Sequence, residues 1–170
     1  MRARAALSLL ALGFALSCAA QTYPSRAIRI VVAFPAGGGS DLAARVVAQK
    51  LSESLGQPVV VENRVGANGS VGAEAVARSA PDGYTLVMGS NANITTNPHL
   101  MALAYDPMKD LAPVAMLTVN PLLLFVNPAL VPVASFREFI DYVRARDGKV
   151  DYASAGNGST AAMRFCAALA

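Results

Sequence analysis

The chain has 170 residues, of which 54% are hydrophobic and 15% charged, and this composition is typical of a globular protein without a low-complexity tract. The formal net charge is +3, and it falls to +1 if Arg2 and Arg4 are removed with a leader segment. No basic patch stands out in the sequence, so nucleic-acid binding has no electrostatic support. The length is sufficient for one domain or for parts of two.

Residues 1–20 are typical of a secretory signal peptide. Two arginines form its positive start, and residues 7–16 form an apolar stretch that is too short to span a bilayer comfortably. Small residues precede an expected cleavage site before Gln21. A rival interpretation is a lipoprotein acylated at Cys18, although the residues before that cysteine fit a lipoprotein motif poorly. We therefore expect an exported, periplasmic protein, with lipid anchoring as the less favoured alternative.

The chain contains two cysteines, Cys18 and Cys166. If Cys18 leaves with the signal peptide, no disulfide can form within the chain. Cys166 falls in an apolar helical pattern, and we expect it to be a small buried hydrophobic residue.

The most informative stretch is 28–41. An apolar, β-branched run extends to Phe34, and Pro35 ends it because proline has no N–H for a sheet ladder. Three glycines follow, and then a helical pattern begins near Ser40 and Asp41. This order predicts a buried strand, a tight glycine loop and the first turn of a helix. Such a junction presents unpaired backbone N–H groups and the positive end of a helix dipole, and both favour binding of a carboxylate or phosphate.

The following stretch alternates between strand and helix patterns. In chain order we expect a helix over 41–55 that ends at Gly56, a strand over 59–61, a helix over 70–79, a turn at 81–83 and a strand over 84–88. The β-α-β-α-β order predicts parallel strands. Ser90 and Asn91 follow the last strand at its carboxyl end, where ligands bind in open α/β sheets. The glycine spacing over 66–72 is better explained by close packing of a helix on the sheet than by binding.

The pattern changes over 97–113, where prolines interrupt it, and we expect a crossover to a second domain near 100–105. The elements predicted after it are strands over 114–118 and 122–126, a helix opened by a capping box at Ser135 and Glu138 that buries Phe136, Phe139, Ile140 and Val143, and a strand over 151–154. Residues 155–160 then repeat the order of strand, glycine turn, hydroxyl and helix. Two junctions that can each bind an anion fit a ligand held between two lobes. The last helix has no stop signal, which suggests a truncated chain.

Several chemistries are disfavoured by missing residues. The first glycine loop lacks the lysine of a phosphate-binding P-loop, and Leu42 occupies the place of the third glycine of a dinucleotide fingerprint. An esterase that pairs Ser90 or Ser159 with His99 is a further hypothesis, but Ser90 is not in a Gly-x-Ser-x-Gly motif. We interpret His99 as a surface or domain-edge residue and Asp41 as a helix-start residue. No metal-ligand spacing occurs, and we expect neither enzyme activity nor a cofactor.

A set of motifs in one order carries a family resemblance over residues 23–160. The motifs are Tyr23-Pro24-Ser25-Arg26, the loop over 34–41, Gly56-Gln57-Pro58 with the strand after it and Glu62-Asn63-Arg64, Gly72-Ala73-Glu74, Pro81-Asp82-Gly83-Tyr84, Tyr105-Asp106-Pro107, and the stretch over 152–159. In these motifs the chain resembles the periplasmic solute-binding proteins of tripartite tricarboxylate transporters, the Bug or TctC type. It departs from them at Ala162 and Met163, where the family often has histidine and leucine, and the family's members are much longer.

The resemblance implies a two-lobed α/β fold of periplasmic binding-protein type with mainly parallel sheets, here truncated. Residues 21–102 would form the first lobe and 103–170 an incomplete second lobe. A small organic acid would bind between them, without a cofactor or metal, and a monomer would deliver it to the membrane components of the transporter. The implied ligand-binding residues are Phe34, Ala36, Gly37, Gly38, Gly39, Ser40, Asp41, Ser90, Asn91, Ala155, Gly156, Asn157, Gly158, Ser159 and Thr160. The alternative is a fragment that is too incomplete to bind.

Overall fold

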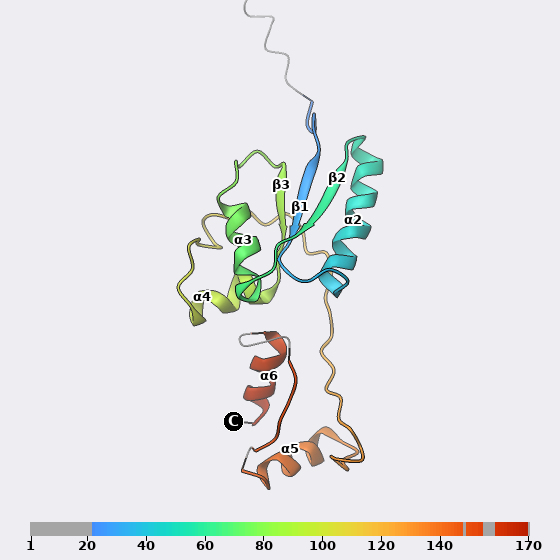
Figure 1. Cartoon of the computed structure of the whole chain (residues 1–170), viewed down its shortest axis with the longest axis vertical. Helices are drawn as coiled ribbons and strands as arrows, with labels where there is room; N and C mark the ends of the chain where they lie inside the picture. Colours follow the sequence, from blue (N-terminus) through green and yellow to red (C-terminus); the bar gives the residue numbers. More distant parts are fainter. Residues whose placement is uncertain (1–21, 148, 155–158, 170) are drawn as a thin grey trace, which may run out of the picture.

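The computed structural model describes residues 22–147, 149–154 and 159–169. The expected signal peptide and residues 155–158 therefore lie outside the described residues. Figure 1 shows an α/β layer formed by the first half of the chain and a smaller helical part, connected to it by a long irregular segment. The α/β fold class predicted from the sequence is confirmed.

A parallel sheet of three strands organises the first half. Its strands are β1 (Ile28–Val32), β2 (Val59–Asn63) and β3 (Thr85–Met88), arranged in the order β2-β1-β3. Both neighbours run parallel to β1, as predicted. The central strand is almost continuously apolar and buried, as expected for a strand covered on both faces. All three strands end at the same edge of the sheet.

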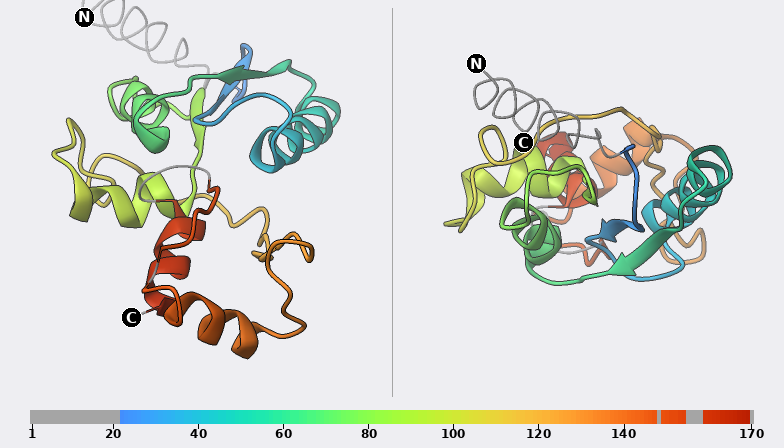
Figure 2. Two further views of the ribbon diagram at one scale, coloured as in Figure 1. Left: turned by 60° about the horizontal axis from the view of Figure 1, so that its bottom comes forward. Right: turned by 90° about the horizontal axis from the view of Figure 1, so that it is seen from above.

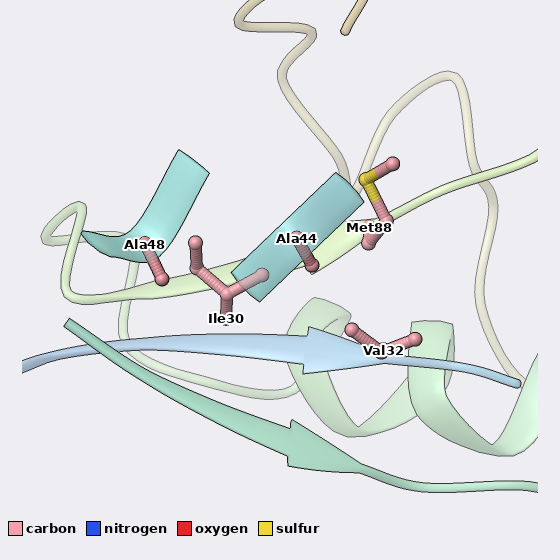
Figure 3. Packing of buried hydrophobic residues seen from close by; sticks show 5 residues of the cluster. All are labelled: Ile30, Val32, Ala44, Ala48 and Met88. Atoms are coloured by element: carbon pink, nitrogen blue, oxygen red, sulfur yellow. The ribbon is translucent and has the colours of Figure 1, made fainter. Parts of the chain in front are cut away.

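Helices cover the two faces of this sheet. Helix α2 (Gly39–Leu55) packs Ala44 and Ala48 on Ile30 and Val32, and these four residues share a cluster with Met88 (Figure 3). Because side chains alternate along a strand, neighbouring positions of β1 face the opposite side, where α3 (Ser70–Ala77) lies. Figure 2 shows the sheet between these helices. The apolar spacing that predicted α2 therefore marks its buried face.

Two glycines have the structural roles predicted from the sequence. Gly56 ends α2 in the left-handed conformation, with φ 66°, and donates its N–H to the carbonyl of Ser52. Gly72 lies where α3 crosses the end of β1, and a Cβ there would be 2.9 Å from both Cα and Cβ of Ala33 and 2.9 Å from the Arg64 carbonyl oxygen. The glycine spacing over 66–72 thus permits close helix–sheet packing.

The chain forms short helical turns after β2 and β3. They are η1 (Ala67–Gly69), a π-helical turn η2 (Ala92–Thr96) and α4 (Asn97–Leu100). The sequence analysis placed no helix directly after β3. The buried amides of Asn93 and Asn97 donate to carbonyls of η1 and hold η2 and α4 against it. These tertiary hydrogen bonds stabilise turns that have little apolar periodicity of their own.

The strands predicted over 114–118, 122–126 and 151–154 are wrong. These residues form no regular structure, and the side chains of Val114, Met116 and Phe125 are more than 80% exposed. A strand becomes stable by pairing its N–H and C=O groups with a neighbour, and no paired strand occurs in the described part of the chain after β3. The β-forming sequence alone was therefore not enough.

The second half contains two helices, α5 (Phe136–Arg144) and α6 (Thr160–Leu169). The predicted capping box is present: Oγ of Ser135 accepts from the N–H of Glu138 at 3.2 Å, and the Glu138 carboxylate accepts from the N–H of Ala134 at 2.8 Å. Of the four residues expected to be buried, Phe139 and Val143 are buried and Ile140 is half-buried.

Two expectations about burial in these helices are wrong. Phe136, in the first turn of α5, is 60% exposed, although its ring stacks on that of Phe139. Cys166 is exposed on α6, although its i,i+4 spacing places it on the same face of the helix as buried Ala162. None of the described helices is long and apolar enough to cross a membrane.

We predict that Gly72→Ala lowers the free energy of unfolding by about 2 kcal/mol, because the new methyl group meets backbone atoms on two sides. Urea denaturation followed by circular dichroism measures this. Gly39→Ala is the matched control, since its Cβ would have nothing nearer than 3.8 Å. Equal stability of the two variants would contradict the packing role of Gly72.

Candidate functional site

The candidate site lies at the carboxyl edge of the sheet, where the loops after β1 and β3 meet. Of the residues predicted there, those over 36–39 and Asn91 are exposed, and Phe34, Ser40 and Ser90 are half-buried. Figures 1 and 2 show that α6 begins on the side that faces this edge. The structure therefore places the described junction residues from both halves on facing sides.

The loop after β1 leads directly into α2. Gly37 has φ 81°, which favours glycine, and Gly38 is the extended N-cap residue with φ −76° and ψ 167°. An α-helix supplies no carbonyl partners for its first N–H groups, and Gly38 has no side chain that could cap them. The N–H groups of Gly39 and Ser40 thus remain available to a ligand at the positive end of the α2 dipole.

Asp41 is buried beneath this loop and holds it in place. Its Oδ2 accepts from the N–H of Gly37 and from Nε of Arg45, both at 2.9 Å, and its Oδ1 accepts from Nδ2 of Asn63 at 2.9 Å. Arg45, the Gly37 N–H and Asn63 together keep the pKa of the Asp41 carboxyl far below its usual range. Both oxygens are engaged within the protein, which supports the interpretation of Asp41 as a helix-start residue rather than a general base.

Asn63 was missed by the sequence analysis as a site residue, although it lies within a family motif. It is the last residue of β2, and its Nδ2 also donates to the carbonyl of Phe34 at 3.1 Å. It therefore connects the end of β2 to the end of β1. Its position at the carboxyl end of a predicted strand, next to the first glycine loop, could have identified Asn63 as a site residue.

Asn120 is a second residue at the candidate site that was not predicted from the sequence. Its Nδ2 lies 3.8 Å from the position that a Cβ on Gly39 would occupy, so the irregular segment between the two halves passes beside the start of α2. A sequence pattern could not place this segment, because its position depends on the path of the chain after α4.

Ser90 and Asn91 lie in the loop after β3, as predicted. The N–H of Ser90 donates to Oδ1 of Asn93 at 2.8 Å, and its Oγ accepts from the N–H of Ala92 at 3.2 Å. Asn91 is exposed, and its carbonyl accepts from Oγ1 of Thr95. Ser90 is thus held within its own loop, and Asn91 is the more accessible of the two.

The second glycine junction differs from the first. Ser159 is buried, and its Oγ accepts from the N–H of Ala162 at 3.2 Å, so it caps α6. Thr160 is the first residue of that helix. The predicted ligand residues Ala155, Gly156, Asn157 and Gly158 lie outside the described residues.

His99 is exposed on α4, as the interpretation of a surface residue requires. Within the described ranges, no group of three or more His, Cys, Asp or Glu side chains is placed to hold a metal ion. The polar groups at the carboxyl edge are mainly backbone N–H groups, amides and hydroxyls, which can bind and orient an anion.

Solved structures with this arrangement are periplasmic binding proteins. The chain is similar to MatC from Rhodopseudomonas palustris with bound malate (TM-score 0.71, 39% identity, 81% of this chain and 47% of that one). It is also similar to an R. palustris protein with adipate (TM-score 0.71, 37% identity, 81% and 46%). A periplasmic transporter structure matches with a TM-score of 0.62 at 40% identity, over 79% and 45%. The described fold is thus that of a periplasmic binding protein, represented over about half its length.

The sequence comparisons identify the family. The model of the tripartite tricarboxylate transporter family receptor, TctC, matches residues 43–167, and the chain belongs to this family. Protein BugT of Bordetella pertussis is 45% identical over 151 residues, which are 88% of this chain and 46% of BugT. The chain spans about half the length of the curated relatives it matches. Because the family consists of transporter receptors, the expectation that the chain is not an enzyme is confirmed.

We predict that Asp41→Asn destabilises the chain at pH 7, because Arg45 and the N–H of Gly37 lose their charged acceptor. The folded-state pKa of Asp41 lies below its unfolded value, so its contribution is present above about pH 4 and is lost as the pH falls further. Urea midpoints between pH 7 and pH 3 should decline less steeply in the variant than in the wild type.

Glu53→Gln is the control for this pH series, because Glu53 forms an exposed ion pair with Lys50 on the same helix. It should leave the midpoint at pH 7 nearly unchanged. An Asp41→Asn variant that is as stable as the control would refute the anchoring role.

Proposed function

We propose that the chain is the ligand-binding part of an extracytoplasmic receptor that captures a small carboxylated solute. The observation that carries this proposal is the uncapped start of α2 at the carboxyl edge of the sheet, with a glycine loop fastened from behind by Asp41. The exposed N–H groups lie together at one end of a helix dipole, and no bulky side chain covers them. We call these N–H groups at the start of α2 the anion seat. A carboxylate supplies the negative charge and the two acceptor oxygens that this seat favours.

Relatives support the choice of solute class. One similar structure contains malate and another contains adipate, and both ligands are small dicarboxylates. Among the described residues, the seat itself contributes mainly neutral donors, so it fits one carboxylate end of a ligand. We propose that the other end of the solute is recognised by groups across from it, towards the start of α6.

We further propose that the parts of the chain have the roles expected from the sequence. Residues 21–102 would form the first lobe, with Phe34, Ala36, Gly37, Gly38, Gly39, Ser40, Ser90 and Asn91 facing the solute. Asp41, which the resemblance also placed among the ligand residues, would instead support the loop from behind, because both of its carboxylate oxygens accept hydrogen bonds within the protein. Residues 103–170 would form part of the second lobe, with the turn over 155–160 opposite. Export would be directed by residues 1–20, and the loaded monomer would deliver its solute to the membrane components of a tripartite tricarboxylate-type transporter.

A binding-incompetent fragment is the alternative, and the exposed apolar side chains over 114–125 favour it. Thermal melting followed by circular dichroism, together with limited proteolysis, separates the two. A cooperative transition and a resistant core would support the receptor, whereas gradual melting and rapid digestion would support the fragment.

We predict that small dicarboxylates, including malate and adipate, raise the melting temperature of the chain. At a ligand concentration of 100 times Kd the added free energy of unfolding is about 2.7 kcal/mol, because the ligand binds only the folded state. Differential scanning fluorimetry and calorimetric titration measure this, with the neutral diamides of the same acids as controls. No shift across a broad acid panel, or equal shifts with the diamides, would refute the proposal.

We predict that Gly39→Pro weakens carboxylate binding roughly 10- to 100-fold, because it removes one N–H that would bond to a charged group. Proline is tolerated in the first turn of a helix, and Gly38 already has the extended conformation that a residue before proline requires. Gly39→Ala keeps the N–H and should bind more tightly than Gly39→Pro. Equal Kd values for the two variants, by calorimetric titration, would exclude this N–H from the seat.

A further inference from the structure

The side-chain amide of Asn93 connects the loop after β3 to the connection after β2. Asn93 lies in η2, and its side chain is completely buried. Its two polar atoms contact different loops, and its backbone carbonyl contacts a third segment. The sequence analysis did not single it out, and it is not among the predicted ligand residues.

Oδ1 of Asn93 holds the loop after β3. It accepts from the N–H of Ser90 at 2.8 Å and from Oγ of Ser90 at 3.4 Å. Because Asn91 follows directly, these bonds also determine where Asn91 leaves the sheet. The amide oxygen therefore determines the position of the loop after β3 at the candidate site.

Nδ2 of Asn93 holds the connection after β2 at Gly69, the residue that the ring of Phe34 approaches. It donates to the carbonyl of Gly69 at 3.2 Å. Gly69 has φ 88°, and a Cβ there would lie 3.0 Å from Cζ of Phe34 and 3.1 Å from Nδ2 of Asn93. The ring of Phe34 thus rests on Gly69, beside the amide that fixes this glycine.

The backbone of Asn93 is fixed from the other side. The hydroxyl of Tyr105 donates to its carbonyl at 2.7 Å, and Tyr105 is buried. Burial raises the pKa of this phenol, so it stays protonated and remains a donor at neutral pH. Asn93 therefore has partners at its two side-chain polar atoms and at its carbonyl, and it cannot shift without breaking several hydrogen bonds.

We infer that Asn93 is a positioning residue of the solute site, whose amide sets the relative positions of Phe34, Ser90 and Asn91. The inference rests on the proposed function for its effect on affinity, but not for its effect on the loops. Replacing Asn93 with leucine keeps a similar volume, removes both side-chain hydrogen bonds, and leaves the Ser90 N–H and the Gly69 carbonyl without their partner.

Asn97 offers a matched control. It is one helical turn further along and is also completely buried. Its Nδ2 donates to Oγ of Ser70 at 2.8 Å and to the carbonyl of Asn68 at 3.1 Å, and its Oδ1 accepts from Nδ2 of Asn68 at 3.0 Å. These contacts stabilise η1 and the start of α3, not the β3 loop. Asn97→Leu should therefore destabilise the fold without moving Ser90.

Two readouts at a temperature where both variants are folded test the inference. Hydrogen exchange of the Ser90 amide, without ligand, should be at least about 10-fold faster in Asn93→Leu than in Asn97→Leu. The Kd for the best-binding dicarboxylate should rise about 10-fold in Asn93→Leu and less than twofold in Asn97→Leu, while both variants lose thermal stability.

The outcomes separate the positioning role from the proposed function. If the wild type binds no carboxylate, the proposed function fails, and Ser90 exchange alone decides the role of Asn93. If Asn93→Leu does not fold, Tyr105→Phe replaces it, because it removes the bond to the Asn93 carbonyl and leaves both side-chain hydrogen bonds of Asn93 in place. Ser90 exchange should then increase by a smaller factor. Unchanged exchange at Ser90 in the folded variant, or an equal loss of affinity in Asn97→Leu, overturns the inference.

Discussion

The carboxylate of Asp41 accepts hydrogen bonds from three separate parts of the chain, and the shape of the candidate site depends on this. Gly37 contributes a backbone N–H from the loop, Arg45 a guanidinium from the next turn of α2, and Asn63 an amide from the end of β2. A charge placed in the first turn of a helix would compete with a bound anion if it faced the same way. Here it faces inward and is paired with Arg45, so the outer side of the loop keeps its positive potential.

The two glycine junctions use the same sequence pattern for different purposes. At the start of α2 no side chain caps the helix, and the N–H groups stay open. At the start of α6 the hydroxyl of Ser159 satisfies the N–H of Ala162. A serine after a glycine turn therefore does not by itself indicate an open anion seat. The difference depends on whether the hydroxyl turns back onto its own helix, and this is a property of the local backbone.

The first half of the fold could be predicted largely because its signals are local. The apolar run of β1, the spacing of Ala44 and Ala48 in α2, and Gly56 at its end each identify an element without knowledge of its neighbours. The strands expected over 114–118 and 122–126 failed for the opposite reason, since a strand depends on a partner that periodicity cannot supply. Asn63, Asn93 and Asn120 were not predicted as site residues. The role of an asparagine depends on the groups within hydrogen-bonding distance of its amide, and a local sequence pattern does not show these groups.

The seat at the start of α2 is made of main-chain N–H groups, and this has a consequence for how such a receptor can diversify. A main-chain donor is encoded by every residue type except proline, so most changes of side chain leave it in place. The carboxylate, which all such acids share, would then be recognised by main-chain N–H groups that mutation rarely alters. A substitution among the side chains around this seat, in contrast, would change the preference for the rest of the solute without loss of the common anchor.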